Sequence, residues 1–172
     1  QSAVVTGPKG EEIHCDEHGR VKVQFHWDRE GQADDTTSCW LRVSSSWAGD
    51  RYGGIAIPRV GMEVLVTFLE GDPDQPLITG CLYHAEHQPP VQLPRDKTRS
   101  TFKSLSSPGG GGYNELRIED RQGQSGAVLA AALGRGERGR DRGARVLEGA
   151  AGHGLGTQRL GLAHLLDLAG LV

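Results

Sequence analysis

The sequence predicts a mainly β protein with a small barrel or sandwich at its centre. Apolar and polar residues alternate over residues 20–27, 39–44 and 62–69, and a further apolar run covers residues 76–83. A period of two is typical of strands that bury one face. Residues that favour turns separate these runs, and no helical period lies between them, which indicates short strands that pack closely.

Turn-forming residues bound each predicted strand, because Gly, Pro and Asp interrupt the alternating pattern. The strands are expected, in chain order, at residues 3–6, 13–17, 20–27, 39–44, 54–58, 62–69 and 76–83. The segment at residues 71–74, Gly-Asp-Pro-Asp, separates the last two strands as a turn, since Asp caps local N–H groups and Pro fixes φ. The barrel is therefore expected over residues 1–84.

One side of each strand is expected to form the core of the barrel. In the two clearest strands the apolar positions are Val21, Val23, Phe25, Val64, Val66 and Phe68. Large aromatic side chains in a small barrel more often fill the interior or a seam than bind a ligand. We therefore expect Trp40 and Phe68 to contribute to the core.

The chain beyond the barrel divides into three parts by composition. Residues 85–112 are polar and aperiodic, which predicts a linker that ends in a Gly-rich hinge. Residues 113–124 alternate again, with Leu116 and Ile118 opposite charged side chains. A single strand of this kind needs partners to bury its apolar face. Residues 125–172 contain no aromatic residue or Pro and predict a low-complexity tail, disordered or weakly helical near its end.

Two explanations fit the change in composition after about Gln124. Gly, Ala, Leu and Arg dominate the tail, and GC-rich codons read in a shifted frame produce these residues. We therefore hypothesise a frameshift. The alternative is a genuine but divergent C-terminal extension, and the nucleotide sequence around codon 124 read in all three frames separates the two.

Composition excludes several classes of protein. The net charge of −3 gives no basic surplus for nucleic acid or an anionic membrane. No apolar run reaches the roughly 18 residues that a membrane span needs. The cysteines, Cys15, Cys39 and Cys81, are odd in number and widely spaced, which argues against a disulfide framework and for a reducing compartment. A Gln at position 1 suggests a fragment.

The best candidate for a metal site is the segment at residues 14–18, His-Cys-Asp-Glu-His. Its His, Cys and Asp side chains are all ligand types for transition metals. Its spacing is not that of a common zinc module, and no second ligand pair follows. We therefore interpret the segment as a strand-to-turn surface and predict no metal or cofactor site.

Two sets of residues are candidates for catalysis. The acidic side chains Glu63, Glu70, Asp72 and Asp74 offer carboxylate pairs of the kind that glycosidases use. Ser44, Ser45 and Ser46 lie in a sequence that also offers His26 and His84. The serines lack the Gly-x-Ser-x-Gly elbow, and the acidic residues have an adequate explanation as turn formers. No catalytic residue is therefore predicted.

Three long segments resemble one family in order and spacing. They are DEHGRVKVQFHWDREG at residues 16–31, SWAGDRYGGIAIPRVGMEVLVTFLEGDPDQPLITG at residues 46–80 and LPRDKTRSTFKSLSSPGGGGYNELRIEDRQG at residues 93–123. From about Val4 to Gln124 the chain resembles the VgrG family, the spike proteins of the bacterial type VI secretion system, which are related to the spike of contractile phage tails. The resemblance implies an OB-fold barrel over residues 1–84 and the start of a trimeric β-helical shaft over residues 113–124.

The resemblance also implies a mechanical role without active-site chemistry. It implies a homotrimer that meets a tube ring protein, a spike-tip protein and secreted effectors. The protein would be cytoplasmic before firing and then secreted through the type VI system into a target cell, without nucleic acid or a stable membrane anchor. The sequence would be a fragment that lacks the base domains and most of the shaft. With two apolar shaft side chains, Leu116 and Ile118, it is expected to be monomeric or weakly trimeric.

The competing hypothesis is an OB-fold binding module for a saccharide or single-stranded nucleic acid. Trp27, Trp40, Trp47 and Tyr52 could stack on sugars or bases. Basic residues do not cluster around them, which weakens the nucleic-acid version.

Overall fold

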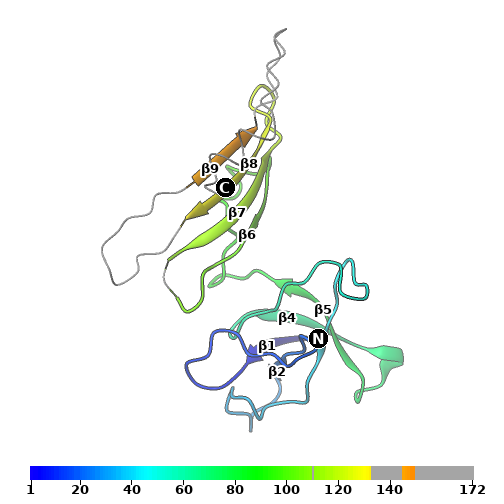
Figure 1. Ribbon diagram of the computed structural model, residues 1–172. Helices are drawn as coiled ribbons and strands as arrows, with labels where there is room; N and C mark the ends of the chain where they lie inside the picture. The colour runs from blue at the N-terminus through cyan, green and yellow to red at the C-terminus, as the bar shows by residue number, and fades with distance from the viewer. Residues whose placement is uncertain (110, 133–144, 150–172) are drawn as a thin grey trace, which may run out of the picture.

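The computed structural model describes residues 1–109, 111–132 and 145–149. Within these residues the chain forms two β-sheets and no α-helix (Figure 1), which confirms the mainly β prediction. The strands of the first sheet are β1 (Ser2–Thr6), β2 (Lys22–Phe25), β3 (Arg42–Val43), β4 (Glu63–Phe68) and β5 (Pro76–Leu82). Among the described residues a single 3-10 turn, η1 (Leu69–Gly71), follows β4 and leads into the turn that the sequence predicts at residues 71–74.

The first sheet curls into a barrel in the order β2-β1-β4-β5-β3. Antiparallel pairing joins β1 to β2 and β4, and β4 to β5, whereas β3 pairs with β5 in parallel. Val21 and Leu41, next to β2 and β3, exchange backbone hydrogen bonds of 3.0 and 2.8 Å. This bridge joins the two edge strands and gives the five-stranded, partly open ring of an OB fold.

The barrel core consists of small aliphatic side chains. They are Ala3, Val5, Val21, Val23, Leu41, Val64, Val66 and Ile78, each at most 1% exposed. The prediction is confirmed for the valines of β4 and for Val21 and Val23, whereas Phe25 and Phe68 pack against the edge of the core. Eight aliphatic side chains make up the interior, and the two rings pack against it from outside.

The placement of Trp40 in the core was wrong. Leu41 points inward, and its neighbour Trp40 therefore lies on the outside, because side chains alternate across a strand. Its ring lies 5.0 Å from the His14 ring and 5.0 Å from the ammonium of Lys22. The indole thus covers the barrel wall instead of filling its interior.

Two further strand predictions in the barrel were wrong. Residues 13–17 form no strand, because the Asp16 carboxylate accepts the N–H groups of His18 and Arg20 at 3.0 and 2.9 Å and fixes a turn. Residues 54–58 also form no strand, and they are mostly exposed. The strand predicted over residues 39–44 is reduced to the two residues of β3.

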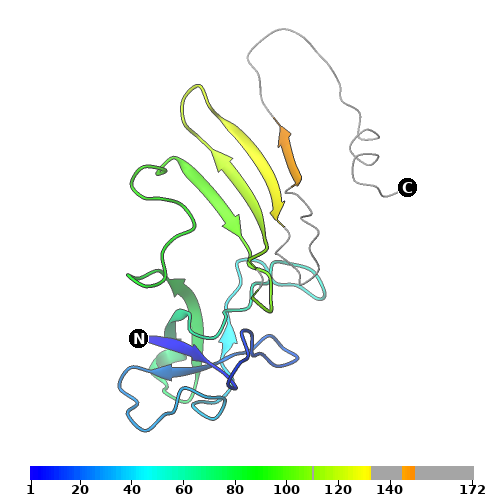
Figure 2. The same cartoon turned by 90° about the vertical axis from the view of Figure 1, so that its left-hand side faces the viewer.

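The second sheet is antiparallel in the order β6-β7-β8-β9 (Figure 2). Its strands are β6 (Arg99–Lys103), β7 (Tyr113–Glu119), β8 (Gly126–Ala132) and β9 (Arg145–Gly149). Strand β7 was predicted from its alternation. The interpretation of residues 85–112 as a linker without strands was wrong for β6, and the prediction of a disordered or weakly helical tail was wrong for β8 and β9.

The physical reason for these corrections is the same on both sides of β7. Two open edges of β7 offer N–H and C=O groups along their whole length, and β6 and β8 pair with them residue by residue. Such pairing overrides the weak strand propensity of polar and Ala-rich segments. The weak helix predicted over residues 153–172 lies outside the described residues. The division of the chain into parts at residues 84, 112 and 124 stays a prediction.

A buried carboxylate fixes the start of the second sheet. Asp96 is 5% exposed and accepts a hydrogen bond of 3.0 Å from the guanidinium of Arg95. Arg99 lies 3.6 Å from the same carboxylate and donates at 3.2 Å to Glu119 at the end of β7. Hydrogen bonds from Arg95 and from the Thr98 hydroxyl hold the pKa of Asp96 and Glu119, respectively, below their usual values.

Acid is therefore expected to loosen the β6–β7 pair. A carboxylate whose folded pKa lies below its unfolded value, about 4, adds stability above that value and loses it as the pH falls through the folded pKa. Below about pH 4, the protection factors of the β7 amides, which correct for the intrinsic pH dependence of hydrogen exchange, should fall. In Asp96→Asn the protection should already be lower at pH 7 and should change less with acid. Asp120→Asn, which removes an exposed carboxylate directly after β7, is the control. Equal acid responses in all three proteins would contradict this role of Asp96.

Candidate functional site

The structure gives the residues of the candidate metal segment other partners. The Asp16 carboxylate accepts Arg20 Nε at 2.6 Å in addition to the two backbone N–H groups of its turn. The His14 ring packs against the Trp40 ring at a tilt of 35°, and Cys15 is an exposed free thiol. Over residues 1–109, 111–132 and 145–149, no three side chains of the His, Cys, Asp and Glu types gather around one point.

The acidic set is split along the barrel. Glu63 begins β4 and lies 3.9 Å from His26, whereas Glu70 and Asp72 lie beyond the other end of that strand. Asp72 accepts the N–H of Asp74 at 3.0 Å, as the turn interpretation requires. The structure therefore brings these four carboxylates to two places instead of one.

The four aromatic candidates also separate. Trp27 stacks on Phe25 at 5.2 Å, and Trp40 lies over Lys22 on the barrel wall. Only Trp47 and Tyr52 share a site, with ring centres 6.1 Å apart and planes at 72°. A continuous stacking platform that uses all four rings does not exist.

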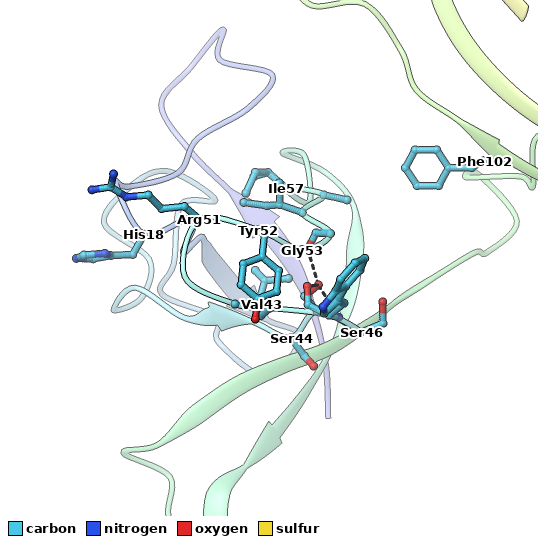
Figure 3. A pocket seen from close by; sticks show the side chains of 17 residues that line it. His18, Val43, Ser44, Ser46, Arg51, Tyr52, Gly53, Ile57 and Phe102 are labelled. Atoms are coloured by element: carbon cyan, nitrogen blue, oxygen red, sulfur yellow. Dashed lines mark hydrogen bonds between the residues drawn. The ribbon is translucent and has the colours of Figure 1, made fainter. Parts of the chain in front are cut away.

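Trp47 and Tyr52 line a groove of about 780 Å³. Figure 3 shows that the segment between β3 and β4 forms most of its wall and that Phe102 of β6 faces it from the second sheet. Ser44, Ser45 and Ser46 line the groove with His18, whereas His26 and His84 do not. The groove therefore does not bring the serines together with either of these two histidines, whose pairing with the serines the sequence analysis had set aside.

The second sheet has an inverted pattern of exposure. On β7 the half-buried residues are Tyr113, Glu115, Arg117 and Glu119, and the exposed residues are Asn114, Leu116 and Ile118. The charged side is covered by its own contacts, such as Thr101 Oγ1 donating to Glu115 at 2.9 Å. The apolar side faces solvent, which is the opposite of a self-sufficient sheet.

Neighbouring strands extend this apolar side. Phe102 of β6 and Leu129 of β8 flank Leu116 in register, and with Ile118 they form a surface that we call the apolar face. The four side chains are 41–67% exposed. Sequence analysis found Leu116 and Ile118 but missed the other two, because they fall in segments interpreted as linker and tail. The strand register is the signal that finds them.

A polar joint connects the barrel to the second sheet. Glu12 accepts the N–H of Gly109 at 2.5 Å, and Arg59 donates to the carbonyl of Leu105 while lying 3.7 Å from Glu12. Hydrogen bonds from the Ser107 side chain and from Gly109 lower the pKa of Glu12.

The part of the chain that the structure describes contains no helix with the length and the apolar character of a membrane span.

Comparison with known proteins assigns the barrel to a family. Residues 3–83 match the type VI secretion system/phage-baseplate injector OB domain. Over 124 residues, 72% of the chain, it is 77% identical to the type VI secretion system spike protein VgrG4b of Pseudomonas aeruginosa, and it spans 15% of that protein.

Two further relatives of this chain also carry VgrG names. The spike protein VgrG1c of Pseudomonas aeruginosa is 58% identical over 125 residues, which are 72% of this chain and 17% of VgrG1c. The actin cross-linking toxin VgrG1 of Vibrio cholerae is 54% identical over 129 residues, which are 75% of this chain and 12% of the toxin. With an injector OB domain in its barrel and this identity to spike proteins, the chain belongs to the VgrG family of type VI secretion system spike proteins.

Proposed function

We propose that this chain is a structural component of a type VI secretion spike. The observation that carries the proposal is the 77% identity over 124 residues to a VgrG spike protein. The OB barrel serves as a rigid collar, and the second sheet is the start of a shaft. Neither part needs a catalytic group for this role, so the chain acts mechanically and not as an enzyme.

The apolar face gives the second sheet its role in assembly. A sheet that shields its charges and exposes Leu116 and Ile118 is stable only when another surface covers the apolar side. Three copies related by a threefold axis bring identical faces together and leave none exposed. The proposed state is therefore a homotrimer.

The remaining partners follow from the spike role. A trimeric collar is seated on the tube ring protein, and the shaft carries the spike-tip protein and secreted effectors. The protein is cytoplasmic before firing and leaves through the type VI system. The saccharide or nucleic-acid module is less well supported, because the four aromatic residues do not form one platform.

A chimera tests the proposal. The matching segment of VgrG4b is replaced by residues 4–124 of this chain in a strain that lacks its own copy, and the tube ring protein released into the medium is measured. We expect release close to that of intact VgrG4b. The same chimera with Leu116→Asp and Ile118→Asp should release little. A chimera that accumulates normally but releases no ring protein would contradict the proposal.

A further inference from the structure

The groove wall contains a short hairpin that presents two aromatic rings, residues 45–54, which we call the Trp47 hairpin. Ala48 and Gly53 form an isolated antiparallel bridge. Gly49 donates to the Tyr52 carbonyl and Gly54 to the Trp47 carbonyl, each at 2.8 Å. These hydrogen bonds close the hairpin over its full length.

Side-chain and glycine geometry fixes the hairpin further. The Ser45 hydroxyl donates to the Gly54 carbonyl at 2.5 Å and accepts the N–H of Trp47 at 3.3 Å. Gly53 has φ of 135°, and a Cβ there would lie 2.4 Å from the Trp47 carbonyl oxygen. A Cβ at Gly49 would lie 2.3 Å from the Tyr52 ring. The hairpin therefore depends on glycine at two places where chain and ring approach closely.

This rigid hairpin exposes apolar surface instead of burying it. Trp47 and Tyr52 are each 65% exposed, and Ile55 beside them is 81% exposed. Ordering these groups on binding costs little entropy, because the backbone and the edge-to-face ring pair are already fixed. Rigid aromatic side chains of this kind are typical anchors of protein interfaces.

The chemistry of the groove favours a protein surface as its occupant. The described residues that line it include no Asn, Gln, Asp or Glu, the side chains that fix the hydroxyl groups of a sugar by directed hydrogen bonds. Its one always-charged cation is Arg51, whereas single-stranded nucleic acid needs a basic track. Apolar and small residues make up most of the wall.

The position of Phe102 indicates which protein surface occupies the groove. Its ring is among the side chains that line the groove of the Trp47 hairpin (Figure 3). Phe102 also belongs to the apolar face, where it pairs in register with Leu116. The groove of the Trp47 hairpin and the apolar face therefore share one residue, Phe102. A surface that covers the Phe102 ring therefore also borders the groove of the hairpin.

We propose that the Trp47 hairpin is the barrel's part of the interface between copies of this chain, with Trp47 as the anchor that packs on a second copy. The inference rests on the proposed trimer but goes beyond it, because it assigns a contact to the barrel as well as to the shaft. It implies that the collar is held in a fixed orientation by its neighbour.

Sedimentation equilibrium of the full chain tests this inference. Trp47→Ser is expected to raise the dissociation constant of the trimer at least tenfold, and Tyr52→Ser is expected to raise it in the same direction. Trp27→Ser is the matched control, since Trp27 is 68% exposed and lies away from the groove. It should change the constant less than twofold. Ile118→Asp tests the trimer itself, independently of the hairpin.

The outcomes separate the two proposals. Loss of association in Ile118→Asp with no effect of Trp47→Ser would overturn the hairpin contact and leave the proposed function intact. No effect of either variant would overturn both. Photo-crosslinking from p-benzoylphenylalanine at position 55 should join two copies, and the same group at position 27 should not. Binding of N-acetylglucosamine oligosaccharides that Trp47→Ser abolishes, without a change in association, would assign the hairpin to a sugar and overturn the inference.

Discussion

Replacing Leu41 by Ala is expected to lower the free energy of unfolding of the barrel by about 2–5 kcal/mol. Leu41 is among the largest fully buried side chains, and its backbone closes the barrel by bonding to Val21. The surrounding valines are β-branched and stiff, so they cannot collapse into the cavity. Urea unfolding followed by tryptophan fluorescence measures the loss at a concentration where the chain is monomeric.

Trp40→Ala is the matched control for this prediction. Trp40 is adjacent in sequence and far larger, but it lies outside the barrel over Lys22. A cation–π contact at a partly exposed site is worth about 0.5–1 kcal/mol, so this change should cost much less than Leu41→Ala. Trp27 and Trp47 remain as fluorescent probes. If Trp40→Ala were the more damaging substitution, the assignment of the inner and outer faces of this segment would be wrong.

This pair of residues shows what the sequence could and could not predict about the barrel. Alternation placed Leu41 and Trp40 on opposite faces, which the structure confirms. It could not say which face was inside, because both carry an apolar residue and the size of the interior depends on all five strands together. The valines of β4 presented no such ambiguity, because their opposite face is largely polar.

The apolar face shows a second limit. Leu116 and Ile118 were recognised from the period of their own strand, since alternation is local. Phe102 and Leu129 could be recognised only after β6 and β8 were paired with β7, and pairing depends on contacts far apart in the sequence. For the same reason, the groove between the Trp47 hairpin and Phe102 could not be predicted, although its aromatic residues were singled out.

The number of apolar side chains decides how strongly the copies should associate. Sequence analysis counted two in each chain and predicted weak association, whereas the structure exposes four on the apolar face alone. At about 1.5–3 kcal/mol for each fully buried side chain, this doubles the favourable term while the cost of association stays the same. We therefore expect a concentration-dependent trimer that is stronger than the sequence alone indicates.

Ile118→Asp is expected to convert this trimer to monomer. Each copy loses the burial of one large side chain, and three carboxylates are brought together at the threefold axis without a partner. Ile118 is 41% exposed in a single copy, so association buries only that part, and the lost burial amounts to roughly 2–4 kcal/mol for three copies, or more than tenfold in the dissociation constant. Light scattering across a range of concentrations measures the mass.

Gln122→Asp adds the same charge in the turn after β7 and should leave the mass unchanged, since that turn lies outside the apolar face. Ile118→Ser, which removes the apolar side chain without adding charge, guards against a general effect on folding and should weaken the trimer less. Hydrogen exchange of the β7 amides confirms that each monomeric variant keeps its second sheet. A stable trimer of folded Ile118→Asp would mean that the apolar face is covered by something other than copies of this chain.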